Sequence, residues 1–341
     1  MKQPWIHKAK TDSLFILSPP FVILAVVFFC QGWLQQLEAH YSFYTWLFFV
    51  VFIDVAHVYA TLFKTYLVPK AFNERKKLLI ILPIICFAIG LVLFLLGSRV
   101  FWVTLAYVAV FHFIRQQYGF MRLYSRLEPK TKLNIFLDNL TIYAATVYPM
   151  AYWFMSPPRN FNWFMENEFF HYQNPQLLQI LGYVYWAIPA LYIVRVVYTF
   201  IKHQYFNIPK NAIVFGTAAS WYFGIVYFNN DLIFTMLNIV SHGVPYMALI
   251  YLREIKQAKT PTSGILQYLN NHKGIIIYIG ILVVLAFSEE YLWEIMVWNE
   301  RFTSGFSGAF ESWHFLLVPL LVVPQFTHYI LDGFIWKTKK G

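Results

Sequence analysis

Residues 78–97 read LLIILPIICFAIGLVLFLLG and contain no charged side chain. At a rise of about 1.5 Å per residue, a helix of this length covers the roughly 30 Å hydrocarbon core of a bilayer. Three basic residues, Arg75, Lys76 and Lys77, come directly before it, as is typical of the cytoplasmic end of a span. The stretch therefore predicts a helix that crosses a membrane.

The composition extends this prediction to the whole chain. Hydrophobic residues make up 59% of the sequence and charged residues 12%, whereas soluble domains carry about 45–50% apolar and about 25% charged residues. We therefore expect an all-helical, polytopic membrane bundle that forms a single transmembrane domain over residues 1–341. The predicted spans, about ten in number, are 14–33, 43–65, 78–97, 100–121, 135–154, 177–201, 212–228, 232–252, 275–293 and 314–335.

The basic residues alternate between the two sides of these spans. With a cytoplasmic N-terminus, the predicted outer segments hold only Arg99, Arg159 and Arg301, and Arg115 and Arg195 lie within spans, which leaves 21 of the 26 basic residues inside. This bias follows the positive-inside rule and predicts that both ends of the chain are cytoplasmic. It also accounts for the net charge of +10, so no nucleic-acid partner is expected.

Four of the ten histidines lie inside four different predicted spans, namely His57, His112, His242 and His328. Counted from the predicted outer ends at residues 43, 100, 232 and 314, they lie 14, 12, 10 and 14 residues deep. This spread corresponds to roughly 6 Å along the helix axes. An ionisable side chain in a bilayer is costly and usually faces a partner, a cavity or a metal. Because imidazole is the commonest protein metal ligand, the matching depths predict one buried metal centre.

Polar residues lie near each histidine on its own helical face. They are Asp54 and Thr61 beside His57, Gln116 after His112, Asn238 and Tyr246 on either side of His242, and Asp332 after His328. Metal-bound histidine usually donates its second ring N–H to a carboxylate or a carbonyl. Asp54 and Asp332 are therefore expected to orient the ligands or to bind the metal themselves. Gln116, Asn238 and Tyr246 are expected to line a catalytic cavity.

The donor set favours iron. Four neutral imidazoles on six-coordinate Fe(II) leave two positions open for dioxygen and substrate. Structural zinc more often recruits cysteine, and Cys30 and Cys86 lie in apolar spans without a metal-binding motif. Zinc and a haem with two axial histidines stay open as alternatives. The main alternative from another class is a proton-coupled transporter, in which the same histidines and aspartates form a titratable relay.

Three short motifs, Asp54-x-x-His57, Phe111-His112-Phe113 and Ser241-His242-Gly243, resemble the Brp/Blh type of bacterial membrane carotenoid dioxygenases. The resemblance covers short pieces of the chain, which carries His328-x-x-x-Asp332 where the family is expected to place His-x-x-x-His. It implies an integral enzyme of a bacterial inner (plasma) membrane that uses non-haem iron to cleave a carotenoid. We therefore expect an oxygenase or dioxygenase whose lipophilic substrate enters from the membrane lipid.

Overall fold

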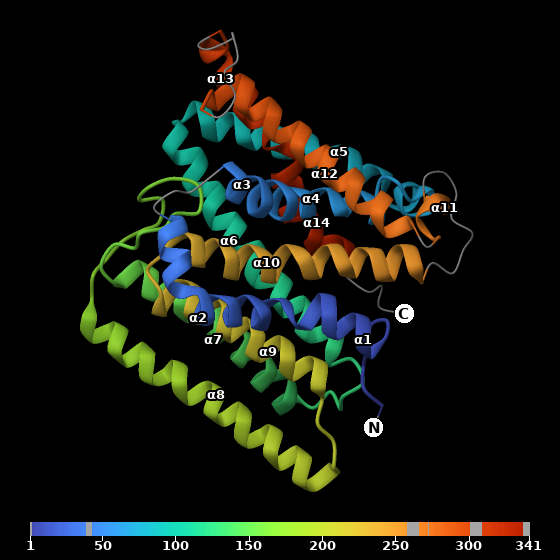
Figure 1. The fold of residues 1–341 in the computed structure, drawn as a ribbon, viewed down its shortest axis with the longest axis vertical. Helices are drawn as coiled ribbons and strands as arrows, with labels where there is room; N and C mark the ends of the chain where they lie inside the picture. The colour runs from blue at the N-terminus through green and yellow to red at the C-terminus, as the bar shows by residue number, and fades with distance from the viewer. Residues whose placement is uncertain (1, 39–42, 258–265, 272, 301–308, 337–341) are drawn as a thin grey trace. The chain divides into compact units, whose positions relative to one another are not determined.

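The computed structural model describes residues 2–38, 43–257, 266–271, 273–300 and 309–336. The regular structure of these residues is helical throughout, and no strand occurs among them (Figure 1). The predicted all-helical fold is confirmed for this part of the chain. Five basic residues that entered the orientation argument lie outside the described residues: Lys259, Arg301, Lys337, Lys339 and Lys340.

The chain divides into two compact units, which are described separately. Unit 1 comprises Met1–His40 and Phe113–Pro245, and unit 2 comprises Tyr41–His112 and Tyr246–Gly341. Two helices, α6 (Ser98–Tyr124) and α10 (Asp231–Ile250), are continuous and contribute residues to both units. The division therefore falls within helices and not at a linker.

The remaining elements belong to one unit each, and the label η marks a short π-helical or 3-10-helical stretch. Unit 1 contains α1 (Ala9–Asp12), η1 (Ser13–Leu17), α2 (Pro19–Glu38), α7 (Lys132–Met155), α8 (Pro175–His203), α9 (Ile208–Trp221) and η4 (Tyr222–Tyr227). Unit 2 contains α3 (Phe43–Trp46), η2 (Leu47–Val55), α4 (Ala56–Ala60), η3 (Thr61–Lys64), α5 (Pro69–Leu95), η5 (Tyr251–Lys256), α11 (Leu266–Leu269), α12 (Gly274–Trp293), η6 (Glu294–Trp298), η7 (Glu311–Trp313), α13 (His314–Leu321) and α14 (Val323–Ile335).

Among the described residues, six helical segments are long and apolar enough to cross a membrane. They are Phe43–Lys64, Pro69–Leu95, Pro175–His203, Asp231–Lys256, Gly274–Trp298 and Glu311–Ile335, and the pair Ala9–Leu17 and Pro19–Leu34, bent by 52°, would make a seventh. Each of the ten predicted spans overlaps a helix, but α6, α7 and α9 are not in this set. These three helices carry buried polar side chains, among them His112, Asp138 and Lys210. The six segments mark the chain as a membrane protein.

In unit 1, α7 packs against α8 and α9, and α2 packs against α9 (Figure 1). An ionic network joins α7, α8 and α9 on the side predicted to be cytoplasmic. The Lys210 ammonium lies 2.6 Å from Glu128 and 3.3 Å from Asp138, and Arg195 lies 2.7 Å from Asp138. Because a buried charge is costly unless it is paired, this network accounts for the polar residues on α7 and α9.

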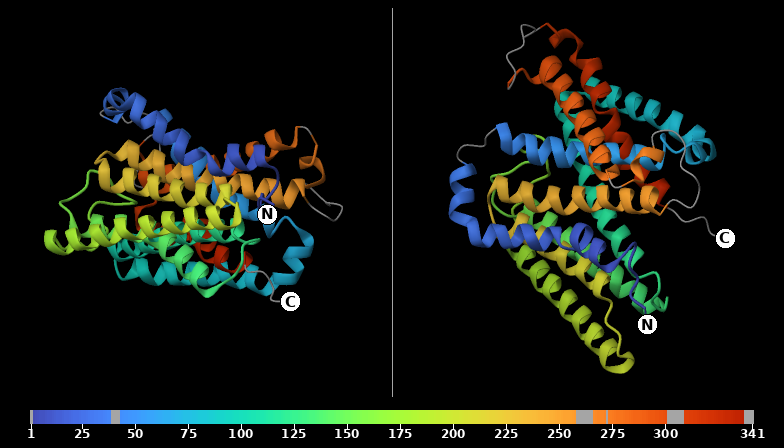
Figure 2. Two further views of the ribbon diagram at one scale, coloured as in Figure 1. Left: turned by 90° about the horizontal axis from the view of Figure 1, so that it is seen from below. Right: turned by 45° about the vertical axis from the view of Figure 1, so that its right-hand side comes forward.

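In unit 2, α5 packs against α13 and α14, and α12 packs against α4 and η2 (Figure 2). α5 and α13 pack closely at Gly90, where an added Cβ would lie 3.4 Å from Pro319, in van der Waals contact. The Tyr59 hydroxyl donates to Glu289 over 2.5 Å and joins α4 to α12. The π-helical η2 directly precedes α4, and such wide turns are frequent at functional sites.

Candidate metal centre

Three of the four predicted ligands meet in unit 2. His57 lies on α4, His112 on α6 and His328 on α14, and none of their side chains is more than 2% exposed. Each offers a ring nitrogen within 4.8 Å of those of the other two. The ring centroid of His328 lies 5.0 Å from that of His57 and 4.6 Å from that of His112. Imidazoles from three helices therefore converge at one buried point, where they could hold a metal ion.

Two aspartates lie near Nδ1 atoms of these histidines. Asp54 lies beside His57, as expected from the sequence, whereas Asp332, expected beside His328, faces His112. Asp54 Oδ1 is 3.6 Å from His57 Nδ1, one helical turn away within η2. Asp332 Oδ2 is 4.0 Å from His112 Nδ1 and belongs to α14, four residues after His328. A carboxylate beside Nδ1 orients an imidazole whose Nε2 binds a metal and makes that nitrogen more basic.

His328 reaches a carboxylate through two hydroxyl groups. Its Nδ1 lies 2.8 Å from the Thr61 hydroxyl, which lies 3.0 Å from the Tyr246 hydroxyl. The Tyr246 hydroxyl donates to Asp332 Oδ1 over 2.6 Å. The sequence singled out Tyr246 and Asp332, and it placed Thr61 on the same helical face as His57 without giving it a role.

The other ring nitrogen of His328, Nε2, differs from Nδ1 in its hydrogen bonding. Nε2 is buried and has no hydrogen-bond partner among the described residues. Buried polar atoms are nearly always hydrogen-bonded, so one without a partner requires an explanation. A lone pair reserved for a metal ion is such an explanation, because metal ligation replaces the hydrogen bond.

The fourth predicted ligand, His242, lies on the part of α10 that belongs to unit 1. It is fully buried, and its ring stacks on Phe113 with centroids 3.5 Å apart and planes inclined by 4°. Gln116 Nε2 donates to the His242 carbonyl over 2.9 Å, so this amide ties α6 to α10. Asn238, one turn earlier on α10, donates to the Phe234 carbonyl over 2.9 Å.

Continuous helices relate His242 to residues of unit 2. Phe113, on which its ring stacks, directly follows His112 on α6. Tyr246 follows His242 by four residues on α10, which places both side chains on one helical face. Within unit 2, the ring of Tyr246 lies 5.9 Å from that of His57 and 5.2 Å from that of His328, measured between centroids.

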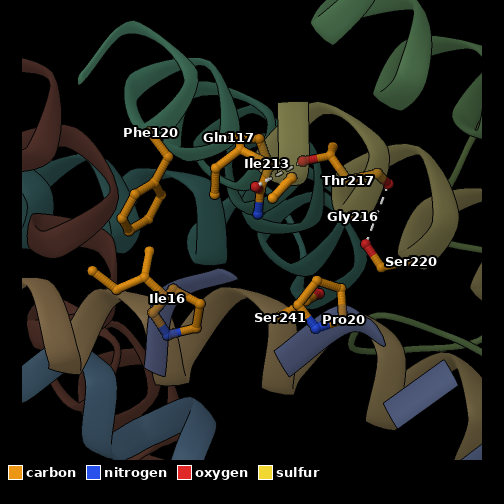
Figure 3. A pocket seen from close by; sticks show the side chains of 11 residues that line it. Ile16, Pro20, Gln117, Phe120, Ile213, Gly216, Thr217, Ser220 and Ser241 are labelled. Atoms are coloured by element: carbon orange, nitrogen blue, oxygen red, sulfur yellow. Dashed lines mark hydrogen bonds between the residues drawn. The ribbon is translucent and has the colours of Figure 1, made fainter. Parts of the chain in front are cut away.

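A small pocket of unit 1, lined by apolar side chains and a few polar ones, lies beside this part of α10 (Figure 3). Ser241 and Pro245 of α10 line it together with Gln117, Thr217 and Ser220. The Thr217 hydroxyl donates to Gln117 Oε1 over 3.0 Å, and the Ser220 hydroxyl donates to the Thr217 carbonyl over 3.2 Å. The cavity volume is about 10 Å³, which is about the room that one water molecule needs. This pocket is therefore too small for a lipophilic substrate.

Comparison with protein-family models, with curated proteins and with solved structures finds no match to this chain.

Proposed function

We propose that the chain is a metal-dependent membrane oxygenase that acts on a lipophilic substrate such as a carotenoid or another lipid. The observation that carries the proposal is the convergence of His57, His112 and His328 at one buried point on three helices. Their donor set consists of imidazoles, with the carboxylates of Asp54 and Asp332 on the outer side of the rings. This arrangement suits a transition metal that keeps open coordination positions.

His242 is the fourth ligand in this proposal. Three facts support it: the imidazole is buried, it stacks on the residue next to His112, and it lies one turn of α10 before Tyr246. Counted along the sequence, His242 lies 10 residues from the outer end of its predicted span, against 12 to 14 residues for the other three histidines. Gln116 then serves the site by fixing the backbone of α10 at the histidine itself.

Fe(II) is the metal that fits best. The unit 2 nitrogens, which lie within 4.8 Å of one another, could share one metal ion, and Fe(II) bound there would supply redox chemistry. A haem would place a porphyrin between two axial histidines, and three converging rings leave no such plane. Zinc retains the same ligands but offers no redox chemistry.

Bound Fe(II) would supply the activation of dioxygen. The chain's own residues hold the ligands and keep water out, because the imidazoles of His57, His112 and His328 are buried. Asp54 and Asp332 orient imidazoles, and Tyr246 lines the space beside His57 and His328. A lipophilic substrate enters laterally from the membrane lipid, since the site lies between helices of a membrane protein.

The proposed topology has ten spans with both termini in the cytoplasm of a bacterial cell, whose inner (plasma) membrane holds the protein. The distribution of basic residues supports this orientation. Three helices, α6, α7 and α9, are not among the segments apolar enough to be identified as spans. They bury polar side chains in the protein. A membrane tolerates such helices where other helices shield them from lipid.

Metal analysis of the detergent-purified protein tests this proposal. We expect about one iron per chain, no Soret band, and loss of the iron in His242→Ala and His328→Ala. His314→Ala is the matched control, because His314 bonds to the Met296 carbonyl at the start of α13 and lies outside the histidine group. Wild-type protein without a transition metal would refute the oxygenase, and a Soret band would refute non-haem iron.

A proton-coupled transporter is the second candidate. It is favoured by the carboxyl groups of Asp54, Asp332 and Glu289, which lie within membrane-spanning segments beside imidazole or phenol groups. Such groups can pass protons through a membrane protein. This candidate predicts metal-free protein and a substrate flux that depends on the pH gradient, which reconstituted vesicles would reveal.

A further inference from the structure

We propose that Thr61 and Tyr246 are positioning residues that fix the tautomer of His328, and that Asp332 anchors them without binding the metal. The inference deepens the proposed function, because it assigns the metal-binding nitrogen of His328. It rests on the hydrogen-bond chain His328 Nδ1, Thr61 Oγ1, Tyr246 Oη and Asp332 Oδ1, with separations of 2.8, 3.0 and 2.6 Å.

The direction of this chain follows from the chemistry of its members. The Tyr246 hydroxyl donates its single proton to Asp332 Oδ1. The Tyr246 oxygen then accepts, and the single hydroxyl proton of Thr61 points to it. The Thr61 oxygen is left to accept from His328, which must therefore carry its proton on Nδ1.

This tautomer leaves Nε2 of His328 with a lone pair. Nε2 is the buried nitrogen that has no hydrogen-bond partner among the described residues. The same ring offers a nitrogen to the three-histidine group of unit 2. A tautomer with the proton on Nε2 could not bind a metal through that atom, so the hydroxyl chain prepares His328 for ligation.

Asp332 lies beside two of the histidines through its two oxygens. Oδ1 accepts from Tyr246, and Oδ2 faces His112 Nδ1 at 4.0 Å. One carboxylate thus serves two histidines, His112 across a short gap and His328 through two hydroxyls. Among the described residues, the group of side chains that could hold a metal ion includes His112 and His328 but not Asp332.

The test uses three variants of the full chain. Thr61→Val keeps the shape of the side chain and removes its hydroxyl, Thr61→Ser restores the hydroxyl, and Tyr246→Phe removes the next member of the chain. Nitrogen NMR of metal-free protein with labelled histidine reports which ring nitrogen is protonated, and the His328→Gln variant assigns the His328 signals.

We expect His328 to be protonated on Nδ1 in the wild type and in Thr61→Ser, and to become a mixture of tautomers in Thr61→Val and Tyr246→Phe. The same two variants should bind Co(II), followed by its visible absorption, about 10–100-fold more weakly, with Thr61→Ser close to the wild type. A purely structural role of Thr61 would change stability without changing the tautomer.

A wild type protonated on Nε2, or an unchanged tautomer in Thr61→Val, would overturn the inference. Because the tautomer is measured without metal, its result is independent of the proposed function. Wild-type protein that binds no Co(II) would overturn the metal centre and with it the oxygenase, whereas the tautomer measurement would still decide the role of Thr61.

Discussion

At the residue scale, the two aspartates of the site differ in the number of histidines that they serve. Asp332 lies 4.0 Å from His112 Nδ1 and connects to His328 through Tyr246 and Thr61. Asp54 has one histidine neighbour, His57, at 3.6 Å. Carboxylates in such positions orient the rings that bind a metal. We therefore expect the contribution of each carboxylate to metal affinity to increase with the number of rings that it orients.

We therefore predict that Asp332→Asn weakens metal binding more than Asp54→Asn does. The amide of asparagine can donate as well as accept, so it no longer dictates the direction of the hydroxyl chain. Removal of such a partner typically costs 10–100-fold in metal affinity. Titration of metal-free variants with Co(II) measures the difference, and equal affinities of the two variants would contradict it.

At the scale of the elements, a single glycine sets the distance between α9 and α2. A Cβ added at Gly216 would lie 2.8 Å from the ring of Pro20, which is closer than real Cβ contacts. The same Cβ would also lie 3.4 Å from the neighbouring Phe21 ring. Contact of these two elements in unit 1 thus depends on the absence of a side chain at residue 216.

Gly216→Ala should therefore destabilise the protein by about 1–3 kcal/mol, the usual cost of overpacking a core. Gly119→Ala on α6 is the matched control, since no atom lies within 4 Å of its added Cβ. The control should be neutral or slightly stabilising, because alanine is a better helix former than glycine. Unfolding in detergent with increasing denaturant compares the two, and equal stabilities would show that α2 can move aside.

The connection between α7 and α8 is organised by one buried carboxylate. Glu168 accepts from the backbone N–H of Trp163, Phe164 and Met165, the latter two over 2.7 and 3.0 Å. This turn lies beside Phe161, which is buried against Phe234 of α10 with ring centroids 4.4 Å apart. The segment is therefore anchored to the helices of unit 1 by its own aromatic residues.

We predict that Glu168→Gln loosens this turn by about 1–3 kcal/mol, because one amide oxygen cannot replace two carboxylate oxygens that accept three donors. Hydrogen exchange of the amides at 163–165 should accelerate. Glu166→Gln is the control, since Glu166 is exposed in the same segment. Similar exchange in both variants would mean that the aromatic contacts alone hold the turn.

At the scale of the whole molecule, the distribution of charge predicts the orientation in the membrane. Only three basic residues fall in the predicted outer segments, Arg99, Arg159 and Arg301. A fluorescent protein fused after Gly341 should therefore fold and fluoresce, and alkaline phosphatase fused there should be inactive, because the C-terminus is predicted to be cytoplasmic. Active phosphatase at this position would require an odd number of spans or the opposite orientation.

The all-helical class and the identity of the clustered histidines could be predicted from the sequence. Long apolar stretches must form helices in a bilayer, because only a helix satisfies all its backbone hydrogen bonds within one segment. The matching depths of His57, His112 and His328 follow from the constant rise of a helix, and these three rings do converge in unit 2. The partner of Asp332 could not be predicted in the same way. The sequence pairs Asp332 with His328 on its own helix, but its carboxylate faces His112 on another helix.

What the sequence by itself determined is thus what depends on local chain geometry: helix, hydropathy, charge bias and the depth of each histidine. Only the tertiary structure decided which side chains touch across helices, because rotation about a helix axis and the choice of packing partner depend on all the helices at once. Thr61 illustrates the difference. The sequence alone places it one turn from His57. Its hydrogen bonds to His328 and Tyr246 form only once η3, α10 and α14 have packed together.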